Sequence, residues 1–360
     1  MTRNDKKRQI SCHSKCSVIT KANRTFLCQH SSGYGIANRS YSNLKTMTVS
    51  SNVPEVKRVE VDPSVISTFK SEHEYIGLSV ELLIEASSYV CIAGNIIPPA
   101  ENAWNRHEAV LVGHLVRLYK LNTALLDQTC QRRRETTFIF ARLAFECIVN
   151  TIFIIRNDRS EIVQSYIEHS MRHEKRLRDR IRNKITERGG EIWPIEKRIL
   201  DSIERSAKNS DVDLDRIDPP KNWAGKNLFD KARDVGLDEA YLGAFAGPSH
   251  SIHGNWHDLL EYNLEVKDGG FLPNFEWHPP RPQLLTTIAH LTVITLGEFF
   301  SEIIGPAGNA VAERLPDLYE RIQILIHLHE EFLVSRTNRE SHLTPTLKIL
   351  ETERQRSEDF

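Results

Sequence analysis

The sequence predicts an all-α protein, a helical bundle of about eight to ten helices with one small β-hairpin insertion. Apolar residues recur at helical spacing through most of residues 71–340, and Gly or Pro interrupts the pattern between successive runs. The stretch 138–155 is apolar on every side except for two charges, and a helix of that composition is buried inside a fold. The chain carries no Gly-rich phosphate loop and no dinucleotide-binding fingerprint, which disfavours nucleotide-cofactor chemistry.

Long helices fill the first half of the predicted domain. Gly189 and Gly190 stop a long polar helix, as glycine commonly does at helix ends. Pro219 and Pro220 lie in an acidic segment, residues 209–222, which is predicted to be a connecting loop because proline bars a continuing helix. The predicted helices cover residues 72–93, 101–128, 133–156, 160–188 and 193–208.

The second half is predicted to hold shorter helices and the β-hairpin. Two strand-like runs flank Asp268, Gly269 and Gly270, residue types that favour a tight hairpin turn. The prolines at 279–282 then precede another helix that is apolar on most faces. These helices are predicted around Phe229 and Glu239 and over residues 249–261, 284–304 and 315–335.

The two ends of the chain are predicted to lack a core. Residues 1–50 hold nine Lys and Arg against one acid, and no apolar run of signal-peptide length follows the charges. We expect residues 1–46 to be a disordered basic leader, or to precede a true start at Met47. Residues 47–70 are then an extended lead-in, 71–340 the helical domain and 341–360 a charged, disordered tail.

The leader also contains thiol and imidazole groups that could bind zinc. Their spacing is irregular for a structural zinc site, so this is the weaker interpretation of the leader. The residues concerned are Cys12, His13, Cys16, Cys28 and His30.

The longest apolar runs are interrupted by polar and charged residues, whereas a membrane span needs about 20 mostly uncharged residues. We therefore expect no transmembrane segment, no membrane partner and a cytoplasmic location. The sequence leaves the oligomeric state open.

Arg142 and Glu146 are the two charges within the apolar stretch 138–155. They lie four residues apart, so they stack one turn above the other on one side of the helix. Burying two charges is costly unless they pair and find further hydrogen bonds, which makes them candidates for a functional site. The alternative is an ion pair that only fixes helix packing. His290 and Glu298, in the later apolar helix, are expected to seek partners among Arg142, Glu146 or His253.

A cluster of histidines follows Ser249. If residues 249–261 form one helix, His250, His253 and His257 share a face, and with Glu146 or Glu298 they could hold a divalent transition metal with an open position for water. The alternative, which we favour, is no cofactor and a helix capped by Ser249 that contains one buried histidine.

Two patterns together resemble a known family. An apolar helix with Arg-x-x-x-Glu, at Arg142 and Glu146, precedes a Ser-x-x-x-His-Gly pattern at Ser249, His253 and Gly254. This combination is similar to a family of uncharacterised bacterial all-helical proteins, a domain of unknown function, over residues 72–331. The resemblance implies that Arg142, Glu146, Ser249 and His253 form one cluster, and it implies no particular reaction.

Basic residues recur every fourth position along the long polar helix. They make a stripe about four turns long that could follow a nucleic-acid phosphate backbone, whereas the alternative is a solvated face of an amphipathic helix. We call these residues the basic stripe, and they are Arg172, Arg176, Arg180, Lys184 and Arg188.

The leading functional hypothesis is a nucleic-acid-directed effector that binds RNA or another nucleic acid, with phage defence or stress response as its setting. In the catalytic version, His253 is the general acid or base and Arg142 stabilises charge on a phosphate, which gives RNase-like cleavage without a metal. Small helical RNases of the higher eukaryote and prokaryote nucleotide-binding family use an Arg and a nearby His, which only Arg336 and His342 approach here. The alternatives are a non-catalytic binding or sensor module and a His/Glu metal-dependent hydrolase.

Overall fold

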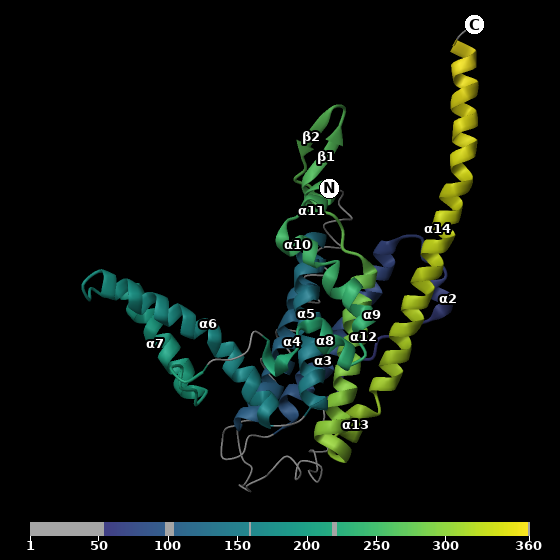
Figure 1. The fold of residues 1–360 in the computed structure, drawn as a ribbon. Helices are drawn as coiled ribbons and strands as arrows, with labels where there is room; N and C mark the ends of the chain where they lie inside the picture. The colour runs from purple at the N-terminus through teal and green to yellow at the C-terminus, as the bar shows by residue number, and fades with distance from the viewer. Residues whose placement is uncertain (1–53, 98–103, 158–159, 218–221, 359–360) are drawn as a thin grey trace.

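Four helices form the centre of the protein. The computed structural model describes residues 54–97, 104–157, 160–217 and 222–358, with side chains as far as Arg336. In it, α3 (Glu72–Ile96), α4 (Arg106–Cys130), α5 (Arg134–Arg156) and α12 (Pro282–Glu298) form a closed ring in which each packs against two others (Figure 1). The predicted all-α bundle is confirmed.

The first two helices of this ring begin at capping boxes. Ser71 and Asn105 are the N-cap residues, and Glu74 and Glu108 fold back to accept hydrogen bonds from the cap backbone. Each reciprocal pair satisfies backbone N–H groups that the first helical turn leaves without partners. The local sequence thus determines where α3 and α4 start.

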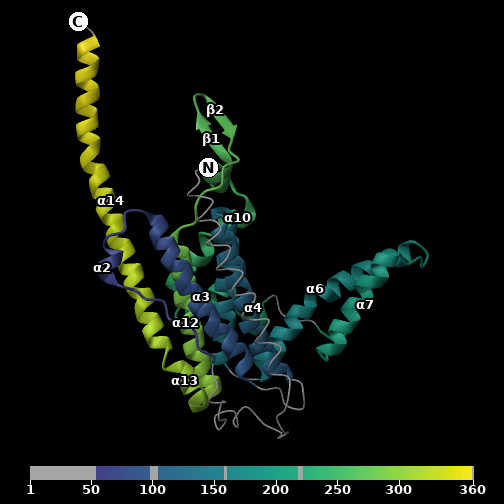
Figure 2. The same cartoon turned by 180° about the vertical axis from the view of Figure 1, so that it is seen from behind.

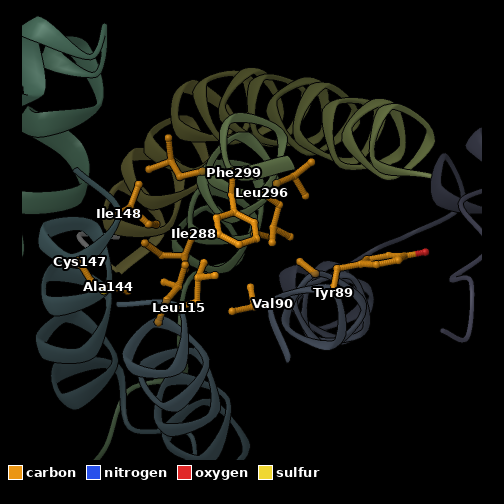
Figure 3. Close-up of a cluster of buried hydrophobic side chains, with 14 of the residues drawn as sticks. Tyr89, Val90, Leu115, Ala144, Cys147, Ile148, Ile288, Leu296 and Phe299 are labelled. Atoms are coloured by element: carbon orange, nitrogen blue, oxygen red, sulfur yellow. The ribbon is translucent and has the colours of Figure 1, made fainter. Parts of the chain in front are cut away.

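The core lies inside this ring. Val90, Leu115, Ile148 and Ile288, one from each helix, gather there, and all four are almost completely buried (Figure 3). Helix α5 is buried along most of its length, as predicted from the stretch 138–155. A helix with so little polar surface is stable only when neighbours cover it, which explains its position in the ring.

A long insertion separates α5 from α12. It contains a helical hairpin of α6 (Ser160–Glu187) and α7 (Pro194–Asn209), which projects away from the bundle (Figure 1). The hairpin has its own apolar cluster, centred on Ile203, Ala207, Leu214 and Ile217. The part of the hairpin far from the ring, which we call the distal hairpin, therefore packs on this cluster and not on the main core.

Short elements complete the insertion. The β-hairpin pairs β1 (Leu264–Lys267) with β2 (Gly270–Pro273), and Lys267 faces Gly270 across a turn in which Gly269 has φ of 79°. Gly269 meets the positive φ that such turns require, so the predicted hairpin is confirmed. The other elements are η2 (Trp223–Gly225), α8 (Leu228–Asp234), α9 (Asp238–Tyr241), η3 (Leu242–Ala246), α10 (Ser249–His253), α11 (Trp256–Asp258) and η4 (Leu259–Asn263).

The last helix packs outside the ring. After η5 (Phe299–Ile304), η6 (Gly305–Gly308) and α13 (Asn309–Ala312), α14 (Leu315–Glu358) runs along α12 and α3 and continues beyond the bundle, on the side opposite the α6–α7 hairpin (Figures 1 and 2). It extends well past residue 335 and through most of 341–360, which the sequence predicts to be an unstructured tail. The lead-in also contains a short helix, α2 (Pro63–Ile66).

A buried ion pair joins the lead-in, α3 and α14. Arg321 donates to both carboxylate oxygens of Glu85, at 2.8 and 2.7 Å, and to the carbonyl of Val59 at 2.7 Å. Glu85 also accepts from the Val59 backbone N–H at 2.8 Å. Both side chains are about 95 % buried or more. Because every charge is matched by several hydrogen bonds, this pair meets the condition for a stable buried ion pair.

Three stretches in the described part of the chain are apolar and long enough to cross a membrane by length and composition. They are α3, α5 and residues 282–312, and 61–67 % of each apolar window is buried inside the protein. The expectation that the charges rule out such segments was wrong. The apolar window of α5 includes Arg142 and Glu146, so two charges among mostly apolar residues still leave its mean hydropathy high.

Candidate functional site

Arg142 is held at a junction between α5 and α10. Its Nε donates to Ser249 Oγ at 3.0 Å, and its guanidinium carbon lies 4.2 Å from the centre of the Phe245 ring. Arg142 is partly buried, with the aromatic face beneath it and the hydroxyl at its side. A cation over an aromatic ring is stabilised by the ring quadrupole, so two independent contacts orient this guanidinium.

Ser249 is occupied by its structural contacts. Its Oγ donates to the carbonyl of Phe245 at 2.6 Å while it accepts from Arg142. A serine nucleophile needs a base that removes its proton, whereas here a backbone carbonyl takes the proton and a guanidinium takes a lone pair. We therefore assign Ser249 the role of orienting Arg142.

The segment that carries Phe245 is a π-helix. η3 lies directly before α10, and its five-residue hydrogen bonding brings the Phe245 ring against both Phe145 and Arg142. Single-turn π-helices occur often at functional sites, because the extra residue re-aims side chains. The sequence does not mark this irregularity.

Glu146 does not pair with Arg142. Both side chains are partly buried, and the ion pairs of the described residues include none between them. The alternative of an Arg142–Glu146 ion pair that fixes helix packing is therefore wrong, and the two charges are less buried than the composition of the stretch predicts. This face of α5 is only partly covered, so water still reaches the two groups, and Arg142 turns toward α10. Among the described residues, Glu85 and Arg321 form an ion pair in which both side chains are buried.

Lys231 lies close enough to Glu146 to be influenced by its charge. The ammonium group is 3.4 Å from the centre of the Trp223 ring and 6.0 Å from that of Phe153, and the residue is only 3 % exposed. Burial lowers the pKa of Lys231 to about 7, although the charge of Glu146 acts in the opposite direction. The aromatic faces provide a partial counter-charge for the cation.

A series of buried and partly buried rings continues from Trp223 toward α4. The rings of Trp223, Tyr166 and His114 follow one another at 5.4 and 5.2 Å between centres, and Cys147 Sγ lies 3.7 Å from His114 Nδ1. Burial raises the pKa of Cys147 to about 12 and lowers the pKa of His114 to about 4. Thiol and imidazole are both neutral at pH 7, so they do not form an activated thiolate pair.

The three histidines do not share a helix face. The predicted helix 249–261 is broken at Gly254, whose φ of 54° ends α10, and Asn255 then caps α11. His250 and His257 approach with 5.7 Å between ring centres, and Asn255 contacts His250, while all three histidines are exposed. The expectation of one imidazole face was wrong, because glycine adopts the left-handed conformation at little cost.

The described residues contain no group of three or more His, Cys, Asp or Glu side chains that could hold a metal ion. Glu298, expected near the polar centre, instead pairs with Arg156 at 2.6 Å. The ring centre of His290 lies 4.9 Å from that of Tyr319, with the two rings tilted by 50°, and His290 also contacts Gln323. The thiols and imidazoles of the leader lie outside the described residues.

The basic stripe lies along α6. Arg176 and Arg180 are exposed, and no ion pair of the described residues involves them. Lys184 is exposed beside Glu187 at 2.8 Å, and Arg188 is paired with Glu196. Arg172 is partly buried. The stripe therefore presents its middle members to solvent, whereas its last member is bound to the hairpin turn.

The Arg336 and His342 pattern falls within α14. Arg336 lies 3.4 Å from Glu72 on α3, and the side chain of His342 lies outside the described residues. Arg336 thus borders the bundle, on a different helix from Arg142 and the basic stripe.

Sequence reasoning missed Lys231, Trp223 and the π-helix η3. Lys231 stands in an ordinary amphipathic pattern, LFDKARD, in which a lysine normally lies on the surface. Only its packing against the Trp223 ring reveals its burial. A signal was available for Trp223, a lone tryptophan after a proline-rich loop, since large aromatic residues tend to anchor loops to a core.

Residues 108–271 match the model of a family of unknown function (DUF5677). This stretch includes Arg142, Glu146, Ser249 and Lys231 as well as the α6–α7 hairpin, and it excludes Arg321 and α12. The match agrees with the expected resemblance to a domain of unknown function, and it names no activity. Neither the curated proteins nor the solved structures provided a match.

Proposed function

We propose, from the premise that residues 108–271 match a family of unknown function, that the protein binds nucleic acid through the α6–α7 hairpin. The observation that carries this proposal is the pair Arg176 and Arg180, which are exposed on a projecting helix and form no ion pair with any carboxylate of the described residues. Arginines that are free of ion pairs can bind phosphate without first breaking an existing contact.

The charge of the distal hairpin supports the same function. Residues 172–208 contain twelve Lys and Arg against seven Asp and Glu, although the chain as a whole has a net charge of −1. The excess positive charge is thus concentrated on the element that extends furthest from the ring at this side (Figure 1). A local positive field of this kind attracts a polyanion even when the whole protein is nearly neutral.

The contact pattern identifies which side of α6 is available. Arg178 is buried and bonded to Asp179 and Asp215, and Lys175 donates to the Ile217 carbonyl at 2.7 Å. These residues attach the loop after α7 to α6. Arg176 and Arg180 point elsewhere on the same helix, so the structural and the phosphate-binding roles fall on different arginines.

The test is binding of fluorescently labelled single-stranded RNA by anisotropy over a range of salt concentrations. R176Q/R180Q/K184Q should weaken binding and reduce the slope of log K against log salt by about 2, since each lost phosphate contact removes about 0.7. The matched control is K197Q/R205Q/K208Q, the same charge change on α7 of the same hairpin. Equal losses for both triple variants, or no binding at low salt, would refute the proposal.

A second function, metal-independent RNA cleavage, is favoured by two observations. Arg142 is oriented by Ser249 and Phe245, and exposed imidazoles at His250, His253 and His257 lie on the segment that follows Ser249. In this scheme His253 transfers the proton and Arg142 stabilises the charged phosphate. RNA cleavage that persists in a chelator and is lost in both H253A and R142Q would support it, whereas cleavage that survives in H253A would not.

The biological setting that we propose is an RNA-directed effector in phage defence or stress response.

A further inference from the structure

The tip of the α6–α7 hairpin is apolar and exposed. Ile192, Trp193 and Ile195 are 53 %, 48 % and 56 % exposed, which is unusual for three large apolar residues so close together. They follow the turn at Gly189 and Gly190, where φ of 71° and 96° ends α6. Clustered apolar residues at the end of a projecting element commonly mark a binding site.

Trp193 is held in a fixed position. The guanidinium carbon of Arg188 lies 4.0 Å from the centre of its ring, and the Trp193 backbone N–H donates to Glu196 at 3.0 Å. Arg188 is in turn paired with Glu196 and donates to the carbonyl of Glu191 at 3.2 Å. Because Arg188, Trp193 and Glu196 all contact one another, the orientation of the indole is restricted before any ligand binds. Binding a flat ligand against it therefore costs little conformational entropy.

The basic stripe leads to this indole. Arg188 is the last member of the stripe and the residue that stacks on Trp193, and Arg176 lies three helical steps of four residues before it. At 1.5 Å per residue the stripe from Arg176 to Arg188 is about 18 Å long, which is roughly five phosphates of a strand that keeps the stacked spacing of about 3.4 Å. A strand bound along Arg176 and Arg180 would therefore bring its bases to the tip.

We propose that Trp193 is a stacking site for an unpaired base of the nucleic acid bound along α6, with Ile192 and Ile195 separating that base from its neighbours. This inference rests on the proposed function. Aromatic side chains bind bases of any sequence through their π-faces, and apolar wedges separate stacked bases. The site thus selects single-stranded over fully paired RNA.

A membrane surface is the competing ligand for an apolar tip with basic neighbours. Glu187 and Glu191 are exposed beside the tip, and a flat anionic membrane would place both carboxylates against its headgroups. A single strand that follows α6 meets Arg176 and Arg180 along its length. The charge pattern therefore favours the strand.

The experiment compares W193A with the wild type for a single-stranded RNA and for a duplex of the same length. W193A should bind the single strand about 5- to 150-fold more weakly with an unchanged salt slope, and W193F should retain most of the affinity, because a stacking contact is aromatic and not ionic. Duplex affinity should change much less. The matched control is W277A, since Trp277 is also half exposed and has Arg133 5.2 Å from its ring centre.

The outcomes separate this inference from the function on which it rests. RNA binding that depends on Arg176 and Arg180 but is equal in W193A and wild type would overturn only the stacking site. A loss in W277A without one in W193A would do the same. Anionic vesicles that bind the wild type and not W193A, while RNA affinity is unchanged, would assign the tip to a membrane. No RNA binding by the wild type would overturn both proposals.

Discussion

Lys231 and Arg321 are both buried cations, and the protein satisfies them in different ways. Arg321 uses the fork of its guanidinium to bind Glu85 and the Val59 carbonyl at once. Lys231 has a ring face in place of a carboxylate, with Trp223 3.4 Å from its ammonium. Guanidinium keeps its charge when buried because several acceptors can share it, whereas an ammonium readily loses its proton.

The first residue-level prediction concerns the buried ion pair. R321M should lower the free energy of unfolding by about 3–5 kcal/mol, since it leaves the Glu85 carboxylate buried with one backbone donor. E85L/R321M should recover most of this loss, because neither charge then remains buried. Urea denaturation measures both. As a surface control, K197Q removes the exposed Lys197–Asp201 pair and should change stability by roughly 0.5 kcal/mol or less.

The second residue-level prediction concerns pH. The pKa of Lys231 is lowered from 10.5 to about 7 in the folded protein, so between these values the unfolded chain holds one proton more. Stability should therefore rise with pH from about 7 toward 10.5 and be flat in this respect below 7.

K231M isolates this contribution. The difference in unfolding free energy between wild type and K231M should grow in favour of the wild type by up to about 1.4 kcal/mol per pH unit between pH 7 and 10. Denaturation at several pH values gives the difference. A pH-independent difference would show that Lys231 keeps an ordinary pKa.

At the scale of elements, the α6–α7 hairpin combines two attachments. Its base belongs to the main core, where Tyr166 lies 5.4 Å from Trp223 between ring centres and Ser165 Oγ accepts from the Ala224 N–H at 2.9 Å. Its distal part packs on a separate small cluster around Ile203. The base of the hairpin thus contributes to the main core, whereas its distal part holds the residues proposed to bind nucleic acid.

The hairpin should be removable. Replacing residues 169–221 by a short Gly/Ser linker joins two points that the Tyr166–Trp223 contact already holds together, so the loop-closure cost is small. Thermal unfolding followed by circular dichroism should remain cooperative, with a midpoint within a few degrees of the wild type. RNA binding should be abolished. A shortened protein that fails to fold would show that the ring depends on the distal hairpin.

At the scale of the whole molecule, the apolar helices cover one another. The windows of α3, α5 and residues 282–312 that could cross a membrane are 61–67 % buried by neighbouring helices. The polar contacts that position Arg142 and Lys231 come from the long insertion between α5 and α12. The ring is therefore the scaffold, and the insertion supplies the candidate functional surfaces.

This packing predicts solubility without detergent. The expressed protein should remain in the supernatant after centrifugation at high salt and give one symmetric peak in size-exclusion chromatography. The physical reason is that mutual burial removes the apolar surface that lipid would otherwise cover. A protein found only in the membrane fraction, and extracted only by detergent, would show that these helices face lipid.

The sequence by itself determined the long helices of the ring and of the α6–α7 hairpin, and the place where the β-hairpin turns. It did not determine the break at Gly254 or the continuation of α14 through most of residues 341–360. Helical periodicity and the residues Asp268 and Gly269 at the β-turn are local signals, and the structure agrees with both. Local backbone preference and the apolar pattern act over a few residues, so they can be read without knowing the fold. The buried position of α5 follows in the same way from its composition.

Only the tertiary structure decided which charges pair and which are buried. Glu85 and Arg321 are 236 positions apart, and Lys231 is buried because Trp223 and Phe153 cover it. Arg142 and Glu146, one turn apart on α5, do not pair with each other, and Arg142 instead contacts Ser249 and Phe245 of a distant segment. Desolvation and pairing of charges depend on the neighbours that folding brings together, so a local sequence pattern does not predict them.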